Sequence, residues 1–291
     1  FFFSSRRRHT RSCLVSWARN VYKRQEPYPL GTGGATKFAE KYIDDAFLVL
    51  NSDIISSLNI RKFIQFHKKK RATVTISLWP VENVWEFGVV GIEADGRIIK
   101  FVEKPKKEEA PSNLINAGAY FLEPEVLDYI ETGRLVSMEK EIFPKIIEDG
   151  KRFYGYTFNG FWIDVGRHQS YIEVNKMLLK RKRKKYVSGK KCVIEGRLKE
   201  SCIGDNVIIE KNAEVKSSVI YGNVIVKNNA ILENCIIASD CIIGKNAIMK
   251  NVVVGDGEVI KDGEILENTK IWNKPVPDGY PEKQIGNPLQ E

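Results

Sequence analysis

The stretch ILENCIIASDCIIGKNAIMK, residues 231–250, decides the fold of the second half of the chain. Aliphatic residues recur in it at every sixth position, with glycine, asparagine and aspartate between them. Repeats of this kind are typical of a parallel β-helix, in which three hexapeptides make one triangular rung and point their aliphatic side chains inward. The series comprises Ile203, Ile209 and Val215 and, after a slip, Val219, Ile225, Ile231, Ile237, Ile243 and Met249.

The residues between the aliphatic positions support the same fold. Asparagine and glycine tolerate the left-handed backbone conformation that the corners of a rung require. A single hexapeptide is common by chance, but a long series in register is not. The sequence therefore predicts a left-handed parallel β-helix over residues 192–291.

The part before the repeats has the pattern of an α/β domain. AFLVLNSDII, residues 46–55, is a continuous apolar run that predicts a buried parallel strand ending at Asn51, Ser52 and Asp53. IRKFIQFHKKK (60–70) predicts an amphipathic helix, and ATVTISLWPV (72–81) a second buried strand. In open α/β sheets ligands bind outside the carboxyl ends of strands, so Asp53 is a candidate site residue.

Three further segments extend this pattern. FGVVGIEADGRIIKFVEKP (87–105) predicts two strands joined by a turn at ADG, and NAGAYFLEPEVLDYI (116–130) a strand followed by a helix. A tight turn at DVG (164–166) leads into a long helix that ends in the basic run 180–185. Because cations suit a helix C-terminus, we interpret the run as a solvated helix end at a domain boundary rather than a nucleic-acid patch.

A glycine-rich stretch, EPYPLGTGGATK, occupies residues 26–37. Its three glycines, Gly31, Gly33 and Gly34, come just before the helix-like run TKFAEKYIDD (36–45). Glycine-rich turns that lead into a helix are typical of loops that hold a phosphate or a nucleotide base.

The composition fits a protein of two domains. The chain has 291 residues, of which 43% are hydrophobic. The net charge of +9 arises largely from residues 1–25, which hold several Arg and Lys and no Asp or Glu. The remainder is nearly balanced, so bulk charge does not favour a nucleic-acid partner. No apolar run reaches the roughly 18 residues of a membrane span, and the five cysteines lack the spacing of a zinc site.

The first 25 residues, FFFSSRRRHTRSCLVSWARNVYKRQ, show neither a helical period nor alternation. Their composition is compatible with a transit peptide. The pieces SSRRRHTR and VYKRQ look more like translated sequencing-adapter text. We therefore expect residues 1–25 to be a non-native leader, 26–180 a partial catalytic domain, 181–191 a basic linker and 192–291 the β-helix with a C-terminal tail.

Four motifs occur in an order that resembles the sugar-1-phosphate nucleotidyltransferases, also called sugar-nucleotide pyrophosphorylases. They are EPYPLGTGGA (26–35), NSD (51–53), FVEKP (101–105) and WIDVG (162–166). The resemblance implies a Rossmann-like nucleotidyltransferase domain followed by the hexapeptide β-helix. Ser52 departs from the family, which usually has glycine there. The family's triphosphate loop, G-x-G-T-R-L-x-P, does not occur in these 291 residues, so we expect an incomplete catalytic domain and an inactive chain as written.

The resemblance also implies roles for individual residues. Asp53 and Asp164 are expected to bind Mg²⁺, which prefers carboxylate and phosphate oxygens. Lys104 is expected to contact the sugar phosphate and, with these two aspartates, to form the catalytic set. Backbone groups of Leu30, Gly31 and Thr32 are expected to contact the nucleotide base. The expected sugar-phosphate pocket comprises Gly88, Glu103, Lys104, Asn116 and Gly118.

The implied reaction is attack of a sugar-1-phosphate on the α-phosphate of a nucleoside triphosphate, with release of pyrophosphate. The enzyme would act mainly by positioning and by neutralising charge. Mannose-1-phosphate with GTP is the first expectation, and glucose-1-phosphate with UTP or dTTP the second. We further expect a cytoplasmic protein that self-associates through the β-helix and has no nucleic-acid or membrane partner.

Two alternatives stay open at this point. A hexapeptide acyltransferase would use a histidine base in the β-helix, whereas His9, His67 and His168 all precede it. A non-catalytic regulatory or scaffold homologue would use the β-helix mainly for assembly. The presence of Asp53, Lys104 and Asp164 argues against that second alternative.

Overall fold

A computed structural model describes residues 12–17 and 20–272, with side chains from residue 26 onward. The chain divides into two compact units, one ending at Trp162 and the other beginning at Ile163. The domain boundaries expected from the sequence lie elsewhere and stay a prediction.

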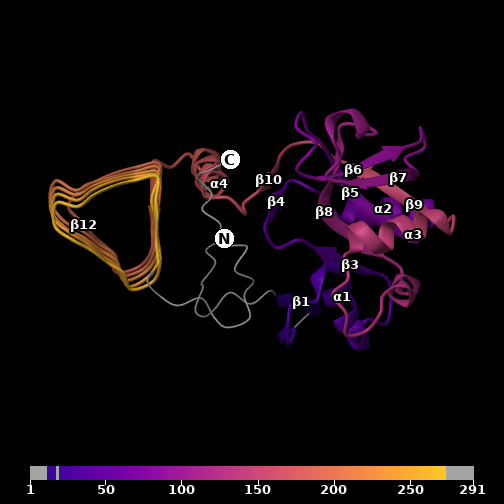
Figure 1. The fold of residues 1–291 in the computed structure, drawn as a ribbon. Coiled ribbons are helices and arrows are strands. Elements are labelled where there is room, and N and C mark those ends of the chain that lie inside the picture. The colour runs from indigo at the N-terminus through magenta and orange to yellow at the C-terminus, as the bar shows by residue number, and fades with distance from the viewer. Residues whose placement is uncertain (1–11, 18–19, 273–291) are drawn as a thin grey trace. The chain divides into compact units, whose positions relative to one another are not determined.

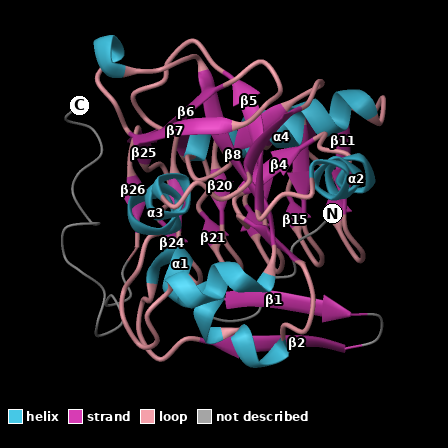
Figure 2. Ribbon diagram, turned by 90° about the vertical axis from the view of Figure 1, so that its right-hand side faces the viewer, coloured by secondary structure: helices cyan, strands magenta, loops and turns pink. Residues whose placement is uncertain are grey.

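The first unit begins with an antiparallel pair of strands, which Figure 2 shows side by side, β1 (Ser12–Trp17) and β2 (Asn20–Gln25). The rest of the predicted leader, and the C-terminal tail from residue 273, lie outside the described residues. The other strands of this unit are β3 (Phe47–Leu50), β4 (Ile54–Ser56), β5 (Val74–Pro80), β6 (Gly88–Ile92), β7 (Ile98–Glu103), β8 (Leu114–Leu122) and β9 (Phe153–Thr157). Its helices are α1 (Gly31–Phe38), α2 (Ile60–Lys70), α3 (Phe143–Glu148), the 3₁₀ helices Glu40–Tyr42, Lys107–Glu109 and Pro124–Tyr129, and a π-helix, Met138–Ile142.

A mixed six-stranded sheet organises the first unit. Five of its strands follow the order β7-β6-β8-β5-β9. The sixth strand, β3, also pairs with β8 and is not part of this order. The predicted α/β fold is confirmed, as are the helix at α2, the buried strand at β5 and the β6–β7 hairpin. One prediction was wrong: β3 is only half-buried and antiparallel to its partner β8 rather than a buried parallel strand. Apolarity of a short run does not reveal the direction of its partner.

Strand β8 shows how the core of this unit forms, because its side chains alternate between the two faces of the sheet. Tyr120 and Leu122 belong to a cluster that includes Phe143 of α3, whereas Phe121 packs with Phe63 of α2. Helices α3 and α2 therefore cover opposite faces of the sheet, as can be followed in Figure 1.

The second unit contains α4 (His168–Arg181) and a parallel β-helix. Strand β10 (Trp162–Asp164) spans the division between the units. Figure 1 looks along the coil, whose three walls form a triangle. The first wall holds β11 (Tyr186–Ser188), β14 (Ser201–Ile203), β17 (Val219–Ile220), β20 (Ile236–Ile237), β23 (Val253–Val254) and β26 (Lys270–Ile271). The second holds β12 (Val193–Ile194), β15 (Ile208–Ile209), β18 (Ile225–Val226), β21 (Ile242–Ile243) and β24 (Val259–Ile260). The third holds β13 (Arg197–Lys199), β16 (Glu214–Lys216), β19 (Ile231–Glu233), β22 (Ile248–Lys250) and β25 (Ile265–Glu267).

The predicted parallel β-helix is confirmed, but its register differs in detail from the prediction. From Arg197 onward, residues stacked in neighbouring rungs are 17 positions apart, so one side of each rung is shortened and the slip recurs. In the first rung, β11 and β12 instead pair with residues 15 positions ahead. Ile225 and Ile231 were predicted to point inward, yet the fully buried positions are their neighbours Val226 and Leu232. A strict six-residue step misses this, because the shortened side shifts the inward position by one residue.

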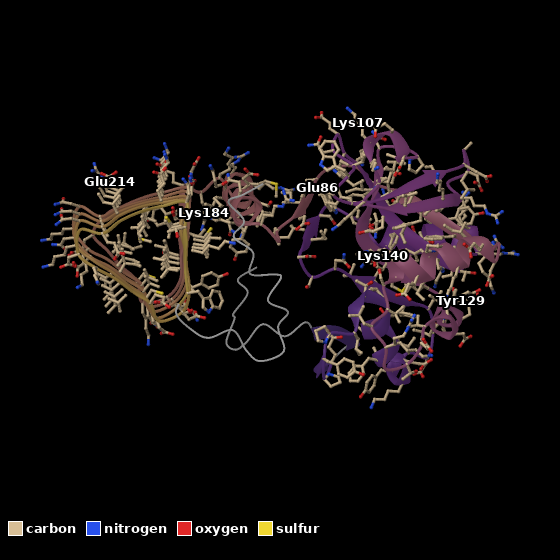
Figure 3. The ribbon with its side chains drawn as sticks, in the orientation of Figure 1. Glu86, Lys107, Tyr129, Lys140, Lys184 and Glu214 are labelled. Atoms are coloured by element: carbon tan, nitrogen blue, oxygen red, sulfur yellow. The ribbon has the colours of Figure 1, made fainter. Side chains whose placement is uncertain are left out.

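The corners of the rungs carry the predicted asparagines. Asn206, Asn223, Asn229 and Asn246 all have positive φ, and the side chains of the first three donate to the stacked residue of the next rung. Figure 3 shows carbon-rich side chains filling the inside of the triangle. Cys235 and Cys241 are free thiols within this core.

Helix α4 packs on the β-helix and thus belongs to the second unit. The ring nitrogen Nε2 of His168 lies 2.8 Å from the carbonyl oxygen of Asn234, and the hydroxyls of Tyr171 and Tyr221 are 2.8 Å apart. No helix among the described residues is long and apolar enough to cross a membrane.

Candidate functional site

The three glycines of the glycine-rich stretch lie inside α1, which begins at Gly31, rather than before a helix as predicted. The amides of Gly33 and Gly34 both donate to the carbonyl oxygen of Val136, at 2.8 and 3.3 Å. A Cβ on Gly31, whose φ is +74°, would lie 2.5 Å from that same oxygen. The glycines are thus explained by close approach to the segment around Val136, which a β-carbon would prevent.

This docking limits which groups of the stretch could meet a nucleotide. The side chain of Leu30 is buried, its amide donates to Glu26 and its carbonyl accepts from the Val136 amide. Gly31 and Thr32 occupy the first turn of α1, whose amides have no partner within a helix. A contact with a base would therefore come from Gly31 and Thr32, and the nucleotide role of all three residues stays a prediction.

Three of the predicted sugar-phosphate residues lie in one row across the sheet. Gly88 of β6 is opposite Glu103 of β7, and the register that pairs Val89 with Ile115 makes Asn116 of β8 the next neighbour of Gly88. A Cβ on Gly88 would lie 2.7 Å from Oε2 of Glu103. Because glycine has no side chain, Gly88 leaves space for the Glu103 carboxylate beside β6.

Gly118 brings β8 close to the end of β3. Its φ is +75°, its carbonyl accepts from the Asn51 amide at 2.8 Å, and a Cβ there would lie 2.9 Å from the Asn51 side chain. Asn116 accepts from the Gly118 amide through Oδ1 at 3.1 Å. Asp53, two residues beyond Asn51, is exposed just before β4. The contact between β3 and β8 thus places the NSD motif beside the predicted sugar pocket.

Lys104 has a backbone conformation that is unusual for its residue type. Its φ is +48°, although it carries a β-carbon and precedes Pro105, which disfavours helical conformations in the residue before it. The Lys104 amide donates to the carbonyl of Phe87 at 2.9 Å, and the side chain is exposed. Residues held in sparsely populated conformations cluster at functional sites, which supports the role expected for Lys104.

A carboxylate that the sequence analysis did not single out, Glu139, links these groups. Oε1 of Glu139 accepts from the Tyr120 hydroxyl at 3.0 Å, and Oε2 accepts from the hydroxyls of Thr32 at 2.7 Å and Ser137 at 2.8 Å. Tyr120 in turn accepts from Nδ2 of Asn116 at 2.9 Å. Glu139 lies in SMEKEIFP, a charged run without periodicity, so no sequence pattern pointed to it.

The carboxyl groups near this site influence each other. Burial raises the pKa of Glu103, and the negative charge of Glu139 raises it further, while Lys104 and Lys140 oppose the shift. Lys140, labelled in Figure 3, follows Glu139 in the π-helix. Burial also raises the pKa of Tyr120 well above its ordinary value. Glu103 therefore keeps its proton to a higher pH than an exposed glutamate does.

Asp164, the second predicted Mg²⁺ ligand, belongs to the second unit. Its Oδ1 accepts from the Gly166 amide at 2.7 Å, which closes the tight DVG turn predicted from the sequence. Two carboxylates suit Mg²⁺, which in nucleotide enzymes takes one or two protein carboxylates together with phosphate oxygens and water. Each carboxylate is thus a suitable ligand for the ion, and the sharing of one Mg²⁺ by Asp53 and Asp164 stays a prediction.

Comparison with protein families places this site in context. Residues 9–181 match the family model described as nucleotidyl transferase. The chain belongs to the nucleotidyl transferase family. Residues 184–285 match a second model, described as the GMPPB C-terminal domain. The resemblance inferred from the four motifs and from the hexapeptide tail is thereby confirmed.

The curated relatives of this chain include proteins that are named for sugar-1-phosphate substrates. It is 41% identical to a probable mannose-1-phosphate guanylyltransferase 3 of Arabidopsis thaliana, over 63% of this chain and 53% of the relative. It is 38% identical to a mannose-1-phosphate guanylyltransferase of Mycobacterium tuberculosis, over 50% of this chain and 41% of the relative. A UTP–glucose-1-phosphate uridylyltransferase of Synechocystis is 36% identical, over 52% of this chain and 40% of the relative. The chain thus spans about half the length, or less, of these relatives.

Proposed function

We propose that the protein transfers a nucleotidyl group from a nucleoside triphosphate to a sugar-1-phosphate and releases pyrophosphate. The observation that carries this proposal is the row Glu103–Gly88–Asn116 beside the NSD motif, in a chain of the nucleotidyl transferase family. The row offers a carboxylate and an amide that can bind sugar hydroxyls, while Lys104 beside it can bind the sugar phosphate as a point charge.

Mannose-1-phosphate with GTP is the proposed substrate pair, and glucose-1-phosphate with UTP or dTTP is the second candidate. Three plant relatives named probable mannose-1-phosphate guanylyltransferase match 55–63% of this chain at 41–43% identity, which supports the first pair. The uridylyltransferase of Synechocystis supports the second. Specificity is a ratio of kcat/KM values, so it has to be measured with both pairs on the same preparation.

The residues of the site have distinct tasks in this proposal. Asp53 and Asp164 hold Mg²⁺, which when bound neutralises the phosphate charge that develops during transfer. Lys104 holds the sugar phosphate, while Glu103 and Asn116 orient the sugar so that its phosphate oxygen faces the α-phosphate. Gly31 and Thr32 present backbone groups to the base. Catalysis then rests on positioning and on charge neutralisation, without a covalent intermediate on the protein.

An assay for pyrophosphate release tests this function. We would compare the 291-residue chain with the product of the gene's full open reading frame, supplying each substrate pair with Mg²⁺. We expect activity from the full product and none from the chain as written, because the G-x-G-T-R-L-x-P loop is not among its residues. Absence of sugar-nucleotide formation by the full product with every pair would contradict the proposed function and favour a regulatory or scaffold role.

We also propose that the protein self-associates through the β-helix in the cytoplasm. Val193, Val259 and Ile265 point outward from the walls and are 51%, 64% and 73% exposed, and covering them would be favourable. The free thiols of Cys235 and Cys241 suit a reducing compartment. Sedimentation of the wild type and of Val259→Glu tests the association, and an unchanged oligomeric state would argue against the second wall, which holds Val259, as the interface.

A further inference from the structure

We propose that Glu139 is a positioning residue that ties the start of α1 to the sugar end of the sheet, so that nucleotide and sugar phosphate are held as one assembly. This inference rests on the proposed function and deepens it. It assigns a task to a carboxylate that lies outside the four motifs. Both elements that it joins, α1 and β8, belong to the first unit.

The contacts of Glu139 run in two directions. On one side, Oε2 accepts from the Thr32 hydroxyl at 2.7 Å, while the same hydroxyl oxygen accepts from the Met138 amide at 2.9 Å. On the other side, Oε1 accepts from Tyr120 at 3.0 Å, and Tyr120 accepts from Asn116. A continuous chain of hydrogen bonds thus joins Thr32 to Asn116 through one carboxylate.

These bonds have the strength and rigidity that a positioning role requires. Hydrogen bonds to an ionised carboxylate are shorter and about twice as strong as those between neutral groups. Tyr120 is almost fully buried, so its hydroxyl cannot readily exchange Glu139 for water. Because Tyr120 also packs edge-on against Phe143, its ring fixes the direction from which the carboxylate is held.

The backbone around Glu139 supports the same interpretation. It lies in the π-helix Met138–Ile142, where the amide of Ile142 reaches the carbonyl of Ser137 at 3.4 Å. Single π-turns are energetically poor and occur frequently at functional sites. Here the π-turn directs Glu139 toward Thr32, although the carboxylate then lies near enough to Glu103 to raise its pKa. Placing two carboxylates together is costly, and a functional task accounts for that cost.

A purely structural role would give a different result from a positioning role. If Glu139 only stabilises the fold, its replacement lowers the melting temperature and leaves the kinetics of the remaining folded protein unchanged. If it aligns the substrates, kcat falls while the KM of each substrate changes little, because each half of the site still binds its own ligand. Misplacement by about 1 Å can cost on the order of 100-fold in rate.

The experiment measures kcat, both KM values and the melting temperature of Glu139→Gln in the full-length product, with mannose-1-phosphate and GTP. Gln keeps the size of Glu but loses the charge, and we expect kcat to fall by about tenfold to 100-fold with less than about threefold change in either KM. Thr32→Val and Tyr120→Phe are tested alone and combined with Glu139→Gln. Each substitution should lower kcat when made alone and have little further effect on kcat when combined with Glu139→Gln, since the three groups act as one unit.

Glu141→Gln is the matched control, because Glu141 lies in the same π-helix. It accepts from the Ser137 amide and pairs with Arg134, so its replacement should lower stability without changing kcat. An unchanged kcat in Glu139→Gln, or equal losses in Glu141→Gln, would overturn the positioning role while leaving the proposed function intact. A wild type without activity would instead overturn the proposed function and this inference with it.

Discussion

At the scale of single residues, Gly31 shows that a glycine needed for packing can resemble, in the sequence, a glycine that contacts a ligand. Its φ of +74° and the carbonyl of Val136 at 2.5 Å from a would-be Cβ both exclude a side chain. Gly150 has a similar φ of +64°, but no atom lies within 4 Å of its would-be Cβ. A substitution at Gly150 therefore measures the cost of the backbone conformation alone, whereas one at Gly31 adds the cost of a steric clash.

We expect Gly31→Ala to lower the free energy of unfolding by about 2 kcal/mol or more, since a positive φ and a clash add together. Gly150→Ala should cost only about 1 kcal/mol, from the backbone conformation alone. Chemical denaturation of both variants measures the difference. Equal losses would show that the segment around Val136 can move away from α1.

Asp164 is the residue whose replacement tests the metal site most directly. Asp164→Asn keeps the oxygen that accepts from the Gly166 amide, so the turn should persist. We expect kcat of the full-length product to fall by orders of magnitude and the Mg²⁺ concentration for half-maximal activity to rise. Asp149→Asn, which removes an exposed carboxylate bonded to Tyr129, is the control and should leave both values unchanged. Near-normal turnover in Asp164→Asn would remove Asp164 from the metal site.

His67 is a buried histidine that makes stability depend on pH. Its ring nitrogens lie 2.8 Å from Oγ1 of Thr75 and 3.1 Å from Oε1 of Glu123. Burial lowers the pKa of His67, and the positive charge of Lys68 lowers it slightly, although Glu123 opposes the shift. The folded state therefore binds this proton less readily than the unfolded chain does.

Stability from the neutral His67 ring is fully present above the unfolded-state pKa of about 6.5 and is lost as the pH falls toward the lower folded-state pKa. We expect the melting temperature to drop between pH 7.5 and 5.5. His67→Gln should flatten this dependence, even though it lowers stability at pH 7.5. A slope that is unchanged in the variant would assign the pH dependence to other groups, among them His168, whose pKa burial also lowers.

At the scale of elements, the asparagine stacks of the β-helix combine two effects. Asn246 has a φ of +56°, and its Oδ1 accepts from Nδ2 of Asn229 in the preceding rung at 3.1 Å. Alanine at this position would lose both the tolerance for positive φ and the hydrogen bond. Glycine would lose only the hydrogen bond.

We therefore expect Asn246→Ala to destabilise the second unit by about 1–2 kcal/mol and Asn246→Gly by clearly less. Denaturation followed by circular dichroism in the β-sheet region measures both losses. If the two variants lose equally, the side-chain stack rather than the backbone conformation holds the corner.

The elements also show what the sequence can and cannot predict. The β-helix, α2, β5 and the β6–β7 hairpin follow from local patterns, because periodicity and turn residues act over a few positions. The antiparallel pairing of β3 with β8 joins residues 69 to 75 positions apart, and local periodicity carries no information about such distant partners. For the same reason the predicted site contained Thr32 and Asn116 but not Glu139, which becomes visible only when α1, β8 and the π-helix meet.

At the scale of the whole molecule, each unit has a hydrophobic core of its own. The core cluster of the β-helix draws its buried residues only from the second unit, and the clusters around β5 and β8 only from the first. We expect calorimetry to show two cooperative unfolding transitions. One of the two transitions should persist when residues 163–291 are expressed alone. A single transition in the whole chain, absent from residues 163–291 alone, would contradict independent folding.

The repeat of 17 residues has a consequence for how this protein can change in evolution. A rung contacts only the rungs before and after it, so the removal or duplication of a complete rung leaves every remaining stack intact. Loss of a single residue, by contrast, turns inward-facing side chains outward along the affected wall. Homologues should therefore differ in the length of this half by multiples of one rung, which has 17 residues from Arg197 onward.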